Sequence, residues 1–139
     1  MAALNATFDP QVEVNVYLSS LTVSSTDIFA RGLILVDKAT NSLNSQRTVI
    51  YLTYAAAVAA QALGYISAGT LKGIRTVFSQ SNSPSLGVMV GNVDLVGGET
   101  YATGLLSCIA SNPNFYWVAC NSRASANIVL VAEQVEECG

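Results

Sequence analysis

The stretch Gly32-Leu33-Ile34-Leu35-Val36 is an unbroken apolar run. A strand that is covered on both faces has this pattern, because every one of its side chains points into a core. A second run of the same kind is Leu86-Gly87-Val88-Met89-Val90. These two runs predict buried strands. Shorter strands are predicted for Arg47–Tyr51 and for the aromatic segment Phe115–Cys120.

Helix-forming segments separate the later strands. Tyr54–Leu63 is rich in alanine, with Thr53 at the N-cap position and Gly64 as a C-terminal stop. Each of the other predicted helices places apolar side chains on one face at helical spacing. The first of these helices is capped by Ser67 or Thr70, and its apolar face consists of Leu71, Ile74, Val77 and Phe78. The second has an apolar face of Tyr101, Leu105, Cys108 and Ile109. The third is capped by Ser122 or Ser125, and its apolar face consists of Ile128, Val131, Ala132 and Val135.

Strands that alternate with helices indicate parallel pairing, with the helices covering the sheet. The expected fold is therefore α/β: a single compact domain with a mixed, mostly parallel sheet flanked by helices and preceded by an N-terminal extended arm. Residues 1–10 form the predicted arm and residues 11–139 the domain. Within that domain, residues 11–18 alternate strictly between polar and apolar side chains. They predict a strand at a sheet edge, or one with a wet face.

The composition is poor in charge. Hydrophobic residues make up 51% of the chain and charged residues only 11%, against about 25% charged in a typical soluble domain. Either Ser, Thr and Asn solvate the surface, or partners cover much of it. The six Lys and Arg residues form no run, so no nucleic-acid partner is expected. No apolar stretch is long enough to span a membrane, and the N-terminus does not have the pattern of a signal peptide.

Catalytic chemistry is not indicated. The sequence contains no histidine, which removes Ser-His and Cys-His nucleophile pairs and any imidazole acid–base group. Its glycines match no phosphate-binding loop. The acidic residues near the C-terminus are interpreted as a solvated face rather than a cation site, and those flanking strands as turn residues. We expect no enzyme activity, no catalytic, cofactor-binding or metal-binding residue, and no cofactor.

The odd number of cysteines argues against a disulfide framework. Cys108, Cys120 and Cys138 are spread over the C-terminal third of the chain and form no Cys-x-x-Cys pair. We interpret them as free cysteines, with Cys108 on an apolar helix face and Cys120 at the end of an apolar run.

The sequence from Val12 to Glu137 resembles the family of contractile phage tail sheath and sheath-like virion proteins. Three regions carry the resemblance. They are the alternating segment Val12–Leu18 leading to Phe29–Val36; the series Arg47–Tyr51, Ala55–Ala59, Leu63-Gly64, Val77–Gln80, Ser83–Leu86 and Val88–Gly91; and the aromatic strand Phe115–Ala119. Sheath proteins are usually much longer, with a C-terminal portion that holds neighbouring subunits. A fragment, a minimal sheath subunit and a related virion part therefore all stay open.

The resemblance implies a structural subunit that surrounds a tail tube in stacked rings, made in the host cytoplasm and located in the virion tail. It also implies partners, namely copies of the chain and the tail tube or other virion proteins. In that family, extended terminal arms add strands to neighbours. We therefore expect Val12, Val14, Val16 and Tyr17 to contact a neighbouring subunit, or else to form an ordinary edge strand within the chain.

Two other functions remain open from the sequence. A capsid decoration or tail-connector protein would bind a preformed lattice instead of polymerising around a tube. A small α/β ligand-binding domain or enzyme would place its site at the strand ends, near Asp37, Asn92 and Asn121.

Overall fold

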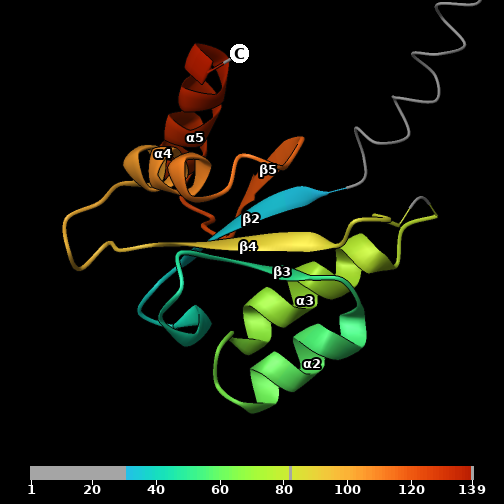
Figure 1. The fold of residues 1–139 in the computed structure, drawn as a ribbon. Helices are drawn as coiled ribbons and strands as arrows, with labels where there is room; N and C mark the ends of the chain where they lie inside the picture. Colours follow the sequence, from blue (N-terminus) through green and yellow to red (C-terminus); the bar gives the residue numbers. More distant parts are fainter. Residues whose placement is uncertain (1–30, 82, 139) are drawn as a thin grey trace, which may run out of the picture.

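The computed structural model describes residues 31–81 and 83–138 (Figure 1). Its sheet is formed by β2 (Gly32–Asp37), β3 (Thr48–Tyr51), β4 (Val88–Val93) and β5 (Trp117–Cys120) in the order β3-β4-β2-β5. β2 pairs in parallel with both β4 and β5, whereas β3 pairs antiparallel with β4. The prediction of a single domain with a mixed, mostly parallel sheet is confirmed. The predicted arm 1–10 and the predicted strand 11–18 lie outside the described residues.

The helices cover the sheet on both faces, as Figure 1 shows. α2 (Tyr54–Ala62) and α3 (Ala68–Phe78) lie against one face, and α4 (Tyr101–Ser111) lies against the other with α5 (Ser125–Cys138) beside it. The short turn η1 (Leu43–Ser45) connects β2 to β3, and all three of its residues have a positive φ. Leu43 is fully buried, so packing of this side chain holds the turn in place.

Alternation along the two central strands divides the core into two clusters. Ile34 and Val36 of β2 point towards α2 and α3, where they pack with Ile74. Leu33 and Leu35 point the other way and pack with Leu105 and other residues of α4. Since all of these side chains are almost completely excluded from solvent, the unbroken apolar run does mark a strand covered on both faces.

Two of the predicted helix starts are confirmed by cap hydrogen bonds. The Thr53 hydroxyl accepts from the Ala56 backbone N–H at 3.1 Å, and the Ser67 hydroxyl accepts from Thr70 N–H at 3.2 Å. Ser67, rather than Thr70, is therefore the cap of α3. Gly64 ends α2 with a φ of +79°, a backbone conformation that glycine adopts without a steric penalty.

Two predicted strands start two residues too early, and one of them also ends three residues too early. β4 begins at Val88 rather than Leu86 and continues to Val93. Gly87 has a φ of +80° and a Cβ there would collide with the Tyr51 carbonyl oxygen, so the chain turns before the strand begins. β5 begins at Trp117 rather than Phe115, because Phe115 N–H is used in a turn to the Pro113 carbonyl.

A buried polar cluster joins the loop after β2 to the start of α3. Asn41 is completely buried, and its side-chain oxygen accepts from Ser67 N–H at 2.9 Å and from the Thr70 hydroxyl at 2.7 Å. Its amide nitrogen donates to the Asp37 carbonyl at 3.1 Å. Because these partners satisfy the amide, the residue stabilises the fold rather than presenting a free polar group.

Candidate functional site

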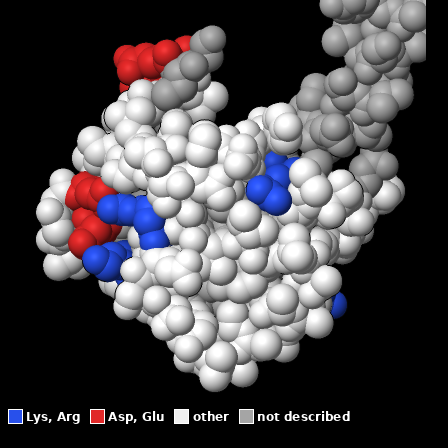
Figure 2. Space-filling model, viewed as in Figure 1, with Lys and Arg blue, Asp and Glu red and all other residues white. Residues whose placement is uncertain are grey.

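The main charged cluster in the described part of the chain lies at the carboxyl end of β4. An Arg47 guanidinium nitrogen is 2.8 Å from a carboxylate oxygen of Glu99, and Lys38 Nζ is 3.0 Å from Asp94 Oδ2. Figure 2 shows these charges gathered at one end of the visible face, most of which is otherwise without charged side chains. No pattern in the sequence indicates this cluster, because Arg47 and Glu99 lie 52 positions apart and match no motif.

Glu99 is the centre of this cluster. Besides Arg47, it accepts hydrogen bonds from Asp94 N–H at 2.6 Å and from the Ser107 hydroxyl at 3.2 Å. Arg47 also donates to the Asn92 carbonyl at 2.9 Å. These bonds fix the loop after β4 against both β3 and α4, and they engage both oxygens of the Glu99 carboxylate.

The pKa values in this cluster shift in the direction expected of paired charges. The hydrogen bond from Arg47 lowers the pKa of Glu99, and the same bond raises the pKa of Arg47. The backbone N–H of Gly97 lowers the pKa of Asp94, with a further contribution from Lys38. Each group is thereby held in its charged form at neutral pH, which suits a structural contact and not a proton-transfer group.

This cluster predicts a pH-dependent stability. We expect Glu99→Gln to lower the free energy of unfolding at pH 7 by about 1 kcal/mol, because a charge-assisted contact becomes neutral. The native pKa of Glu99 is below its ordinary value of 4.5. Its contribution is therefore complete above pH 4.5 and is lost as the pH falls through the lowered native pKa.

Urea denaturation of both proteins between pH 7 and pH 3 tests this expectation. The difference in unfolding free energy should stay constant down to about pH 5 and then shrink. Glu133→Gln is the matched control, since Glu133 is exposed on α5. A difference that is unchanged at pH 3, or that also occurs in the control, would contradict this role of Glu99.

The residues considered for a strand-end ligand site make hydrogen bonds within the fold. Asn92 lies inside β4 rather than at its end, and its side-chain amide donates to the Gln46 carbonyl at 3.0 Å. Asp37 accepts from Ala39 N–H at 2.9 Å, as a turn residue does. Asn121 follows β5 and is exposed, with its backbone N–H bonded to the Leu35 carbonyl. Asp37 and Asn92 lie on the paired strands β2 and β4, and Asn121 directly follows β5 on the other side of β2.

Cys108 and Cys120 are free cysteines, as predicted. Cys108 is buried against β4, and desolvation raises the pKa of its thiol to about 11. Burial also raises the pKa of the half-buried Cys120. Both thiols are therefore protonated at neutral pH, and neither is an activated nucleophile.

The acidic residues of α5 are exposed, as expected of a solvated face. Across residues 31–81 and 83–138, no group of three or more His, Cys, Asp or Glu side chains is arranged to hold a metal ion. No helix in this same part of the chain combines the length and apolar character needed to cross a membrane.

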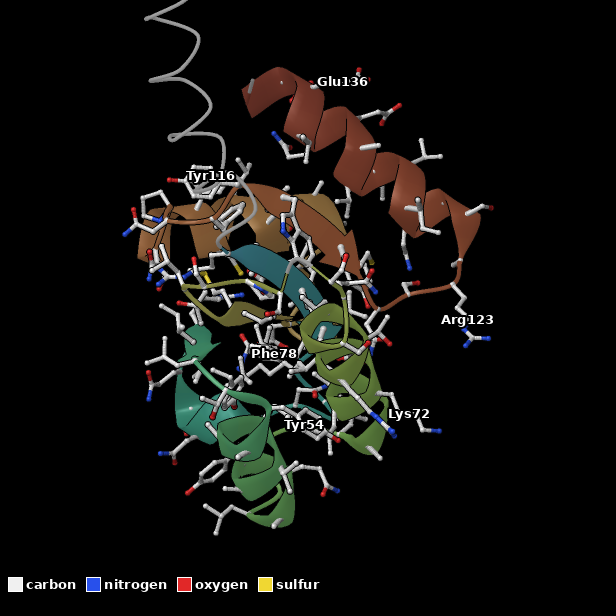
Figure 3. All side chains as sticks on the ribbon, turned by 90° about the vertical axis from the view of Figure 1, so that its right-hand side faces the viewer. Tyr54, Lys72, Phe78, Tyr116, Arg123 and Glu136 are labelled. Atoms are coloured by element: carbon white, nitrogen blue, oxygen red, sulfur yellow. The ribbon has the colours of Figure 1, made fainter. Side chains whose placement is uncertain are left out.

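A concave feature with a mainly apolar lining is a groove between β5 and α5, which we call the β5–α5 groove. It has a volume of about 650 Å³. Residues 116–120 line one side, and the residues lining the other side are Ile128, Val131, Ala132, Val135 and Glu136 of α5. Figure 3 shows Tyr116 and Glu136 on this side of the sheet, away from Tyr54, Lys72 and Phe78 on α2 and α3.

The groove leaves most of the apolar face of α5 exposed. The apolar face of α5 exists as predicted, but only Val131 on it is buried. Ile128 is 50% exposed and Val135 is 43% exposed. The reason is geometric: α5 packs against α4 and against the edge strand β5, so little of the sheet lies beneath it. The helical periodicity identified an apolar face, but not whether the described body covers it.

The residues predicted to contact a neighbouring subunit lie outside the described residues. Val12, Val14, Val16 and Tyr17 therefore remain a prediction. In comparisons with protein families, curated proteins and solved structures, no family model, protein or structure matched this chain.

Proposed function

We propose that this chain is a structural virion protein, a subunit that assembles with copies of itself around the tail tube of a contractile phage tail. The proposal begins from the sequence resemblance of residues 12–137 to tail sheath proteins. It assigns the chain no enzyme activity and no cofactor. Its partners are further copies of the chain and the tail tube.

The observation that best supports an assembling subunit is the apolar character of the described surface around β5 and α5. Four large apolar side chains of α5 are more than one-third exposed, namely Ile128, Val129, Leu130 and Val135. Tyr116, at the start of β5, is 56% exposed. Tyr116, Ile128 and Val135 line the β5–α5 groove together, and grouped apolar surface of this kind marks interaction sites in proteins that fold as single domains. The low charge content favours the same interpretation.

The two edges of the sheet add to this support. β3 and β5 are the outermost strands of the described sheet, so each has one side that pairs with no described strand. Unpaired edges are a liability in a monomer, yet they allow one subunit to add a strand to another. A subunit that exchanges strands with its neighbours needs such an edge.

The direct test is to measure the mass of the purified chain by size-exclusion chromatography with light scattering, and to image it by negative-stain microscopy. We expect rings, tubes or a mass that rises steeply with concentration. A chain that stays monomeric at high concentration would contradict self-assembly. Binding of that monomer to a preformed capsid or tail would favour a decoration or connector protein instead.

Removing residues 1–18 tests which segment makes the contact. We expect the truncated chain to remain folded by circular dichroism but to lose assembly, because the proposed contact strand with Val12, Val14 and Val16 is gone. Removal of residues 1–10 alone is the control, and it should preserve assembly. If the chain without residues 1–18 still forms the same particles, these residues are not the subunit contact.

A further inference from the structure

We propose that residues 11–18 of each free subunit form a strand that pairs with the open edge of β5 and covers the β5–α5 groove of the same chain. This inference goes beyond the proposed function, because it concerns the isolated subunit: the segment that the proposed function places against a neighbouring copy occupies the groove of its own chain while the subunit is free. The groove is formed by described residues, and the segment proposed to fill it, residues 11–18, lies outside them.

β5 has an edge that pairs with no described strand. This strand pairs with β2 on one side, and no described strand lies on its other side. In a parallel pair, alternate residues direct their backbone groups towards the partner, so the remaining residues direct theirs outward. The outward N–H and C=O groups of β5 can therefore bond an added strand, as in other cases of strand addition.

The lining of the β5–α5 groove matches the apolar positions of residues 11–18. The α5 side is apolar except for Glu136, and the β5 side is formed by residues 116–120. Among residues 11–18, Val12, Val14, Val16 and Leu18 are the apolar positions of an alternating pattern. A strand with this pattern places one apolar face in the groove and leaves Gln11, Glu13 and Asn15 facing water. The contact removes apolar surface of both partners from water.

The described fold begins beside β5. Arg31 is the first described residue, and its carbonyl oxygen accepts from Tyr116 N–H at 3.0 Å. Its side chain donates to the Leu86 carbonyl at 3.1 Å and to the Asn114 carbonyl at 3.3 Å. These bonds fix Arg31 beside the start of β5, and Tyr116 at that start lines the groove.

The connection is long enough for the segment to return. Residues 19–30 can span about 40 Å when extended, whereas a four-residue strand such as β5 is about 13 Å long. A tether of this length gives an effective concentration of the order of millimolar. A chain at micromolar concentration is therefore expected to fill its own groove before it fills that of a second copy.

Hydrogen–deuterium exchange of the full chain, measured over a range of concentrations, tests this proposal. We expect amides of residues 12–18 and of β5 to exchange slowly, with protection that does not change on dilution. Rapid exchange of residues 12–18 at every concentration would overturn the proposal. Protection that disappears on dilution would also overturn it, because the occupant would then be a second copy.

Two matched pairs of variants locate the contact. Ala132→Glu places a carboxylate in the groove at an exposed helical position, whereas Ala126→Glu adds the same charge to α5 at a residue that does not line the groove. We expect the first to accelerate exchange of residues 12–18 by about tenfold or more, and the second to leave it unchanged. Val14→Asp and Asn15→Asp form the equivalent pair within the segment.

The outcomes separate this inference from the proposed function. Equal exchange in Ala132→Glu and Ala126→Glu would exclude the groove as the seat of the segment, even if the chain assembles into rings. Suppose instead that residues 12–18 are protected from exchange at every concentration and that Ala132→Glu removes this protection. That result would support the inference even in a chain that never assembles.

Discussion

Leu33→Ala is expected to lower the free energy of unfolding by about 2–5 kcal/mol, because it removes a completely buried side chain from the centre of the sheet. Leu33 lies on β2 and packs in the cluster that includes Met89 and Leu105. β4 and β5 flank its strand on both sides, so the surrounding structure has little freedom to collapse into the cavity. The loss is a large part of the 5–15 kcal/mol typical of a domain.

Guanidinium denaturation at pH 7 measures this loss as a shift in the transition midpoint. Leu52→Ala is the matched control, because Leu52 is 64% exposed and the change should stay within about 0.5 kcal/mol of zero. Similar losses in the two variants would contradict the assignment of Leu33 to the core. A changed denaturant slope would instead indicate an altered unfolded or native ensemble.

Gly104→Ala is expected to destabilise the protein by about 1–3 kcal/mol, although alanine is the better helix former. Gly104 is buried in α4 where the helix crosses β4. A Cβ at this position would lie 2.6 Å from Val93 Cγ2 and 3.0 Å from Val93 Cβ. Because Val93 is itself completely buried, the added methyl group has to push the helix away from the sheet.

Gly73→Ala in α3 is the matched control and should have the opposite sign. A Cβ there would be 4.0 Å from Ile34 Cδ1, an ordinary van der Waals distance. We therefore expect a gain of about 1 kcal/mol from helix propensity. Thermal unfolding of both variants measures the two effects. A stabilising Gly104→Ala would mean that α4 does not pack this closely on β4.

Much of the fold follows from local sequence patterns. The unbroken run at residues 32–36 identified the central strand, since only a strand covered on both faces tolerates an apolar side chain at every position. Thr53 and Ser67 fixed two helix starts through their hydroxyl groups. Such signals depend on only a few neighbouring residues, so they can be recognised in the sequence without knowing which elements pack together.

Strand ends were less predictable. Leu86 belongs to the apolar run by composition, yet it is 45% exposed and precedes the strand. The turn at Gly87 is imposed by the close approach of the Tyr51 backbone, which is distant in the sequence. The charged cluster around Glu99 likewise depends on β3 and β4 being neighbours, and no local pattern specifies that pairing.

The sequence by itself determined the α/β class, the order of the described elements and the apolar face of α5. Only the tertiary structure decided that Val131 is buried while Ile128 and Val135 line an open groove. Helical periodicity records which side chains share a face, but burial depends on what lies opposite. Beside the edge strand β5 no described strand lies opposite that face.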